Sequence, residues 1–344
     1  MRPNHTNRGF TILELVAIIA SLVIGYVAAV PQLGQARDQA RELKDSTQLR
    51  GITQACAIWA QNNRERYPMP SRIDLNGSTI ARPDGLVGRD LRLDTTGNTL
   101  CLLIWNGFLP PELAVSPNEV GNVEVMANFN SAAPQSAMRP RDAFWDPAFR
   151  GTPLDEWGGK VPGAVGDASH NSYAQMAYHG AREAVWSNTF SSAEVCWGNR
   201  GPAYTLDRGV WTPLAGSSFG DGSTTLRIHG APETWEGNIA FNDQHVEFLD
   251  RPDPMHLTWV FPGLEDQLNR RHPDNVFHSE NDHDRTVIDE NIALVAGSDG
   301  RGSLKATGKP GGKGALDQKN NYLRPISKVV PGENGTIETQ FWID

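Results

Sequence analysis

The sequence predicts an α+β fold in which one long N-terminal α-helix, a membrane span followed by an amphipathic half, packs on an antiparallel β-sheet head with long loops. Apolar residues fill positions 10–30, and a helical spacing of apolar residues continues to position 62. The pattern over 237–249 is typical of a β-hairpin. The 34 glycines and 23 prolines among 344 residues exceed average usage, which excludes an all-helical protein.

The first element is a polar stretch at 1–9, which contains two arginines, followed by the apolar run at 10–30. A run of this length is sufficient for a helix to span a bilayer. No basic residue follows the run before Arg37, and this asymmetry favours a cytoplasmic N-terminus and an extracytoplasmic remainder. We therefore expect a single-pass protein of the cytoplasmic membrane.

Glu14 is the one charged residue in the apolar run. The run is also compatible with a secretory signal peptide that ends near Ala29, or with an uncleaved signal anchor. Glu14 counts against both alternatives, because a carboxylate inside an apolar segment is costly and marks function. The alternative for Glu14 itself is a carboxylate near enough to the membrane edge to be hydrated.

The stretch GFTILE at 9–14 resembles the processing site of type IV prepilins and type II secretion pseudopilins. A short basic leader ends in Gly9, an aromatic residue follows, and Glu14 occupies the fifth mature position. Pro31 adds to the resemblance, because pilin-like proteins often have a helix-kinking proline at this distance. The resemblance implies that a prepilin peptidase cleaves after Gly9 and that the new amino group of Phe10 is methylated.

The resemblance further implies a domain organisation and a function. The chain divides into a leader (1–9), a transmembrane helix (10–30), an amphipathic helix (31–62) and an extracytoplasmic pilin-like head with irregular insertions (63–344). We expect a minor or lineage-specific structural subunit of a type II secretion pseudopilus or a type IV pilus-like fibre, assembled through its N-terminal helix. Its partners would be prepilin peptidase, other pilin or pseudopilin subunits, the secretion platform with its ATPase, and the inner membrane. In the fibre, Glu14 would pair with the N-terminal ammonium of Phe10 in a neighbouring subunit.

The amphipathic half of the helix follows Pro31, where apolar residues recur at intervals of three and four. The predicted apolar stripe includes Leu43, Thr47 and Ile52. We place Asp45 among the charged residues on the other faces. A proline inside a helix removes one backbone hydrogen bond, so we expect a kink at Pro31.

Two segments of the head weakly resemble pilin-like proteins of planctomycetes. The first, 99–118, reads as a buried helix or strand followed by Ser116-Pro117-Asn118, where the family often has a Cys-containing tripeptide. The second, 229–249, begins at His229 and has Gln244 where Gly is usual. These segments support the fold and not a subfamily.

The hairpin over 237–249 contains Asn242-Asp243 as its apparent two-residue loop. Both residues tolerate positive φ, so we expect a type I′ turn. This loop places Ile239 opposite Val246 on the face toward the long helix. The final ten residues alternate and predict a terminal strand, whereas the Gly- and Lys-rich stretch at 297–316 predicts a loop.

The middle of the chain, 120–225, is rich in Gly, Pro, Asn and Trp. We expect loops and short strands there, and long irregular insertions of this kind commonly carry recognition surfaces. The sequence does not indicate what is recognised.

Charge and cysteine content limit the function classes. The formal charge is −9, from 31 basic and 40 acidic residues, so we expect no nucleic-acid partner. Three cysteines are too few for a disulfide framework and lack zinc-site spacing. Cys56 lies close to the apolar stripe and is interpreted as a core residue. Cys101 and Cys196 are candidates for one long-range disulfide, the alternative being two buried thiols.

A cluster of ligand-type residues near the C-terminal part is a candidate site for a transition metal or calcium, and calcium is the candidate cofactor. Its members are His278, Glu280, Asp282, His283 and Asp284. Their spacing matches neither H-E-x-x-H nor an EF-hand loop, so a solvated acidic loop is the alternative. The sequence has no Walker or G-x-G-x-x-G motif, and we expect no enzyme. The alternative function is a membrane-anchored periplasmic binding or enzymatic domain that uses its N-terminus for targeting alone.

Overall fold

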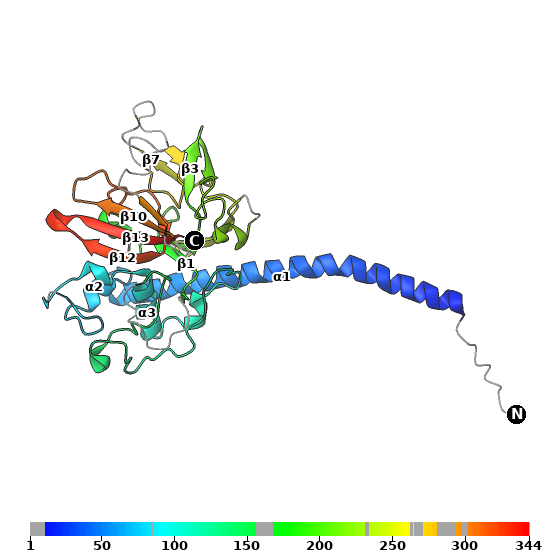
Figure 1. The fold of residues 1–344 in the computed structure, drawn as a ribbon, viewed down its shortest axis with the longest axis horizontal. Coiled ribbons are helices and arrows are strands. Elements are labelled where there is room, and N and C mark those ends of the chain that lie inside the picture. The colour runs from blue at the N-terminus through cyan, green and yellow to red at the C-terminus, as the bar shows by residue number, and fades with distance from the viewer. Residues whose placement is uncertain are drawn as a thin grey trace. The chain divides into compact units, whose positions relative to one another are not determined.

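The computed structural model describes residues 11–83, 85–155, 168–230, 234–261, 264, 271–280, 293–296 and 302–343. Two compact units are distinguished, Met1–Lys44 and Asp45–Asp344, the second of which we call the head unit (Figure 1). Helix α1 (Ile12–Asn62) contributes residues to both units. Each unit is described separately below.

The apolar part of α1 is exposed in the first unit. Every described side chain from Ile12 to Ile24 is exposed to solvent. Among the described residues, no helix is sufficiently long and apolar to cross a membrane.

The predicted fold class is therefore wrong in two respects. The structure has mixed helix and sheet, but its N-terminal helix does not contain the expected membrane span. The head unit also contains several sheets in place of the single antiparallel sheet that was expected. The physical reason for the second difference is that the middle and C-terminal insertions pair among themselves, as the β3–β4 hairpin (Tyr204–Asp207 and Val210–Pro213) does.

The central sheet of the head unit has five antiparallel strands. In spatial order they are β11 (Leu323–Arg324), β1 (Tyr173–Met176), β2 (Val195–Asn199), β5 (Gly237–Phe241) and β6 (Val246–Leu249). A second sheet comprises β12 (Ile326–Pro331), β13 (Ile337–Ile343), β10 (Gly302–Gly308) and β9 (Ala293–Ala296). Strands β7 (Thr258–Val260) and β8 (Arg271–Pro273) form a further pair.

Short helices surround these sheets. The segment that was expected to form a buried helix or strand forms a helix, α3 (Thr96–Trp105). The Thr95 hydroxyl caps this helix by accepting a hydrogen bond from Asn98 N over 3.2 Å. The other helices are α2 (Pro70–Ile73) and the 3₁₀ turns at Leu91–Leu93, Pro111–Ala114, Pro140–Asp142, Gly180–Val185, Thr224–Arg227 and Glu333–Gly335.

The central sheet is buried on both faces. On one face a first cluster joins the sheet to the C-terminal half of α1; its members include Leu49, Ile52, Cys56, Cys196 and Ala240. On the opposite face lies a second cluster, whose members include Tyr204, Trp211, Trp235, Ile239, Phe241 and Phe277. Along β5, Ile239 and Phe241 belong to the second cluster and Ala240 to the first, as alternation along a strand requires.

The hairpin of β5 and β6 is present, but its register differs from the prediction by one residue. Ala240 pairs with Val246, and Ile239 pairs with Glu247. The loop has three residues, because Gln244 adopts a left-handed conformation (φ 73°) and closes the turn with its N–H donating to Phe241 O over 2.9 Å. A shift of one residue exchanges the faces of a strand, so Ala240, rather than Ile239, faces α1.

Two expectations for the C-terminal region have different outcomes. The terminal strand is confirmed as β13. Part of the predicted loop at 297–316 instead forms β10, which pairs with β13 along its whole length from Gly302 to Gly308. Backbone pairing thus overrides the low strand propensity of the glycine-rich sequence.

Candidate functional site

Asp45 lies at the centre of a buried polar cluster in the head unit. Its side chain is 0% exposed. The Tyr173 hydroxyl donates to Oδ1 over 2.9 Å, and Asn238 Nδ2 donates to Oδ2 over 2.8 Å. The Ser116 hydroxyl also donates to Oδ1, and His229 Nε2 lies 3.3 Å from Oδ2. The carboxylate therefore has four partners, which come from three separate segments of the chain.

The helical period explains why Asp45 is buried. It lies four residues before Leu49 and one further turn from Ile52, and both of these side chains are fully buried against the sheet. Leu43 is 70% exposed, and Thr47 is also exposed. The predicted stripe is therefore wrong at Leu43 and Thr47, and Asp45 faces the core and not solvent.

The environment of Asp45 keeps it ionised. Burial by itself raises the pKa of this carboxyl group, but hydrogen bonds from His229, Ser116 and Asn238 outweigh burial and lower the pKa below its ordinary value. An ionised carboxylate inside a protein costs several kcal/mol unless it is paired. Packing of α1 on the central sheet consequently depends on these partners.

The two segments with the weaker family resemblance meet at Asp45. Ser116 and Asn118 come from the first segment, and the Asn118 amide lies 3.3 Å from the ring of His229. His229 and Asn238 come from the second segment. Their shared role is to hold α1 in the head unit.

The cluster contains Asp, His and Ser but lacks the geometry of a hydrolase triad. The Ser116 hydroxyl donates to Asp45, and not to His229, so the imidazole is not placed to activate it as a nucleophile. Ser116 and the side chain of His229 are at most 5% exposed. The arrangement is that of an enclosed structural site.

Glu14 forms a capping box with Thr11 at the start of α1. Thr11 N and its hydroxyl donate to Glu14 Oε2 over 2.9 and 3.0 Å. Glu14 N donates back to the Thr11 hydroxyl over 3.3 Å. Sequence analysis missed this local role, although T-x-x-E before an apolar run is the signature of the motif.

The predicted cleavage and methylation residues, Gly9 and Phe10, lie outside the described residues. Helix α1 continues through position 31, but the side chain of Pro31 also lies outside the described part. The predicted processing and the predicted kink therefore stay predictions.

The three cysteines are free thiols buried in the head unit. Cys101 Sγ donates to Asp146 O and Cys196 Sγ to Ala240 O, each over 3.3 Å. No bridge joins Cys101 to Cys196, which favours the alternative of two buried thiols. Burial raises the pKa of Cys56 to about 12, as expected of a core residue.

The candidate metal cluster is only partly within the described residues. Glu280 is fully buried and accepts from Asn275 N over 3.2 Å, while the ring of His278 lies 4.7 Å from that of Trp211. Asp282, His283 and Asp284 lie outside the described residues. Where side chains are described, no three His, Cys, Asp or Glu residues are placed to hold a metal ion.

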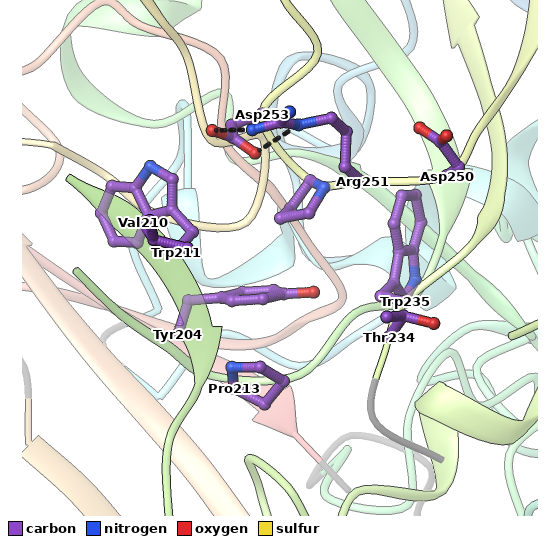
Figure 2. A pocket seen from close by; sticks show the side chains of 10 residues that line it. Tyr204, Val210, Trp211, Pro213, Thr234, Trp235, Asp250, Arg251 and Asp253 are labelled. Carbon is purple, nitrogen blue, oxygen red and sulfur yellow. Dashed lines mark hydrogen bonds and ion pairs between the residues drawn. The ribbon is translucent and has the colours of Figure 1, made fainter. Parts of the chain in front are cut away.

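A pocket of about 390 Å³ opens on the side of the second cluster (Figure 2). Tyr204, Trp211 and Pro213 line one wall from the same face of the β3–β4 hairpin, because Tyr204 pairs with Pro213 and Leu206 with Trp211. The remaining walls are lined by Val210, Thr234, Trp235, Asp250, Arg251, Pro252 and Asp253. The hairpin lies in the 120–225 region, where we expected insertions that carry recognition surfaces.

No protein-family model matches the chain, and neither a curated protein nor a solved structure is significantly similar to it.

Proposed function

We propose that the chain is a structural subunit of a pilus-like or secretion-pseudopilus fibre, in which neighbouring subunits cover the first part of α1. The observation that carries the proposal is the exposure of large apolar side chains on this part. The side chains, each between 43% and 83% exposed, are Ile12, Leu13, Leu15, Val16, Ile18, Ile19, Leu22, Val23, Ile24 and Tyr26.

These side chains surround the helix. Successive residues of a helix are about 100° apart, so pairs such as Ile12-Leu13 and Ile18-Ile19 cannot lie on a single face. A helix that is apolar on all sides is stable when it is enclosed. Packing against one surface would leave the opposite side in water, whereas a bundle of like helices encloses every side. Full burial stabilises by about 1.5 to 3 kcal/mol per large side chain.

The buried cluster at Asp45 supports the same function. A fibre subunit transmits force between its helix and its head, and the attachment must resist separation. Asp45 accepts hydrogen bonds from side chains of Ser116, Tyr173 and Asn238, all of which are distant in sequence. Pulling α1 out of the head unit would leave a carboxylate and several buried donors unpaired.

The proposal includes processing by a prepilin peptidase, with the head displayed outside the cytoplasm. Mass spectrometry of the N-terminal peptide from the protein of its native host tests this step. We expect a mature terminus at Phe10 that carries one methyl group. A terminus at Met1 or near Val30 would contradict processing as a fibre subunit.

Variants of the capping box separate the two roles of Glu14. Glu14→Gln retains an oxygen that can cap Thr11 N but removes the charge, and Thr11→Ala removes the capping hydroxyl but keeps the charge. If the charge pairs with a neighbouring subunit, Glu14→Gln abolishes fibres seen by electron microscopy and Thr11→Ala assembles. If Glu14→Gln forms normal fibres, the charge of Glu14 is not needed for assembly and capping is its remaining role.

The pocket favours a second candidate, a binding domain that uses its N-terminus for targeting alone. Its volume of about 390 Å³ is within the usual range for small-molecule sites. This candidate predicts that both Glu14→Gln and Thr11→Ala leave localisation and ligand binding unchanged and that no fibre contains the chain.

A further inference from the structure

Two polar side chains of the pocket have donors without an acceptor in the described part of the chain. They are the Tyr204 hydroxyl and Trp211 Nε1, on residues that are 2% and 8% exposed. Figure 2 shows Tyr204 lying across the pocket with its hydroxyl directed toward Trp235 and Thr234. An unpaired buried donor costs about 1 to 3 kcal/mol, so a ligand that accepts from these groups gains that energy.

The opposite side of the pocket offers acceptors, and its charges are nearly balanced. Arg251 Nε and Nη2 donate to the two carboxylate oxygens of Asp253, each over 2.9 Å. Asp250 is exposed at the margin and contributes one further negative charge. Donors on one side and carboxylates on the other suit a ligand whose groups both accept and donate hydrogen bonds.

The walls between these polar groups are aromatic or proline rings. Trp235 is fixed there, because its Nε1 donates to Arg200 O over 2.8 Å and its ring packs edge-on against Phe277 at 4.7 Å. Pro213 and Pro252 complete the apolar lining. Rigid rings of this kind bury ligand surface with little loss of conformational entropy.

We propose that the pocket between the β3–β4 hairpin and residues 250–253 binds a neutral saccharide unit. A pyranose has an apolar C–H face for the rings and hydroxyl groups that both accept from Tyr204 and donate to Asp250. A quaternary ammonium ion, another ligand of aromatic pockets, accepts no hydrogen bond and would leave both orphan donors unpaired. An anionic sugar would be repelled by Asp250. The proposal is independent of fibre assembly.

Isothermal titration calorimetry on the purified full chain tests this assignment. The probes are the methyl glycosides of glucose, galactose, mannose and N-acetylglucosamine, with choline and galacturonate as charged comparisons. We expect saturable binding of at least one neutral glycoside. Binding of choline or galacturonate without a neutral glycoside, or no binding at all, would overturn the proposal.

A matched pair of variants locates the binding. Tyr204→Phe removes one hydroxyl oxygen and is expected to weaken glycoside binding about tenfold, which corresponds to about 1.4 kcal/mol. Tyr67→Phe removes another buried unpartnered hydroxyl, in the first cluster, and is expected to leave binding unchanged. Equal affinity of wild type and Tyr204→Phe would contradict the assignment, provided that thermal unfolding shows both variants folded.

A third variant distinguishes a neutral ligand from a cation. Asp250→Asn removes the charge at the margin but retains an oxygen that accepts hydrogen bonds. A neutral saccharide is expected to bind this variant up to about tenfold more weakly, because a hydrogen bond to a charged acceptor becomes one to a neutral acceptor. Loss of all measurable binding would show that the site depends on the charge of Asp250 and would overturn the assignment of a neutral ligand.

Discussion

The first turns of α1 and the surroundings of Asp45 differ in the polarity and in the exposure of their side chains. From Ile12 to Tyr26 large apolar residues are exposed, whereas in the head unit a carboxylate is fully buried. The buried charge is stable because four partners from the same unit surround it. The exposed segment has no comparable set of partners among the described residues. The head unit thus supplies the partners of its buried charge, whereas our proposal assigns the covering of the N-terminal segment to neighbouring subunits.

The largest expected effect concerns the exposed segment. Leu22→Glu places a charge on a helix face that the proposal buries between subunits, so we expect loss of fibres by electron microscopy and an unchanged melting temperature of the head unit. Met255→Glu is the control, because Met255 is exposed to a similar extent, 70% against 67%, but lies in the head unit. Fibres formed normally by Leu22→Glu would mean that this segment is not an assembly surface.

The next effect concerns the buried carboxylate. Asp45→Ala leaves the Ser116, Tyr173 and Asn238 donors without their acceptor, and we expect the free energy of unfolding to fall by about 3 to 5 kcal/mol. Asp38→Ala alters an exposed position on the same helix and is expected to change the free energy of unfolding by less than about 0.5 kcal/mol. Urea denaturation of the two variants measures the difference. Similar stabilities would show that the cluster does not hold α1.

The free energy of unfolding is expected to depend on pH because of His179. This side chain is buried and has no hydrogen-bond partner in the described part of the head unit. Burial lowers the pKa of His179 from 6.5 to about 3, so between these values the unfolded chain binds the proton and the native state does not. The contribution of His179 to stability is therefore lost as the pH falls below about 6.5, with a slope approaching 1.4 kcal/mol per pH unit. Asp94 and Asp155, whose pKa values burial raises to about 6 and about 7, contribute in the opposite direction.

His179→Phe removes this titration. Urea unfolding between pH 7 and pH 4 is expected to show this variant gaining stability relative to the wild type as the pH falls, while Met255→Phe, at an exposed position without a titratable group, runs parallel to the wild type. Parallel curves for wild type and His179→Phe would contradict the prediction.

The contribution of Asp45 to stability changes at lower pH. The folded pKa of Asp45 is depressed, so its stabilisation is complete above about pH 4 and is lost as the pH falls through the folded pKa.

The smallest effect concerns the hairpin that packs against α1. Gln244 has a positive φ of 73°, which costs an ordinary residue about 1 kcal/mol more than glycine. Gln244→Gly is expected to raise the free energy of unfolding by about that amount, and Gln340→Gly, in the middle of β13, to lower it by about 0.5 to 1 kcal/mol. Destabilisation by Gln244→Gly would argue against the three-residue loop.

The sequence predicted elements whose signal is local. The apolar spacing beyond residue 31 located the buried positions Ile52 and Cys56, and alternation located β13. The hairpin was located but misregistered, because Asn242-Asp243 can serve as a two-residue loop or as part of a three-residue loop ending at Gln244. The choice depends on which face of β5 meets α1, and that is a tertiary property.

The sites depended on contacts that no local pattern contains. Asp45 lies on the same helix face as Leu49, and this spacing was the available signal for its burial. Its partners are up to 193 residues away, and a charged residue is ordinarily assigned to a solvated face. The membrane span was predicted from the apolar run at 10–30 and the charge asymmetry around it, whereas no helix among the described residues is long and apolar enough to cross a membrane.

Photo-crosslinking in the native host tests the central claim most directly, that other subunits enclose the first part of α1. A photoreactive amino acid replaces Leu22, and the crosslinked product is identified by mass spectrometry. We predict a covalent adduct in which the second peptide comes from the N-terminal apolar segment of another copy or of another fibre subunit. The absence of a protein adduct at Leu22, or adducts with the head of the same chain alone, would contradict the claim.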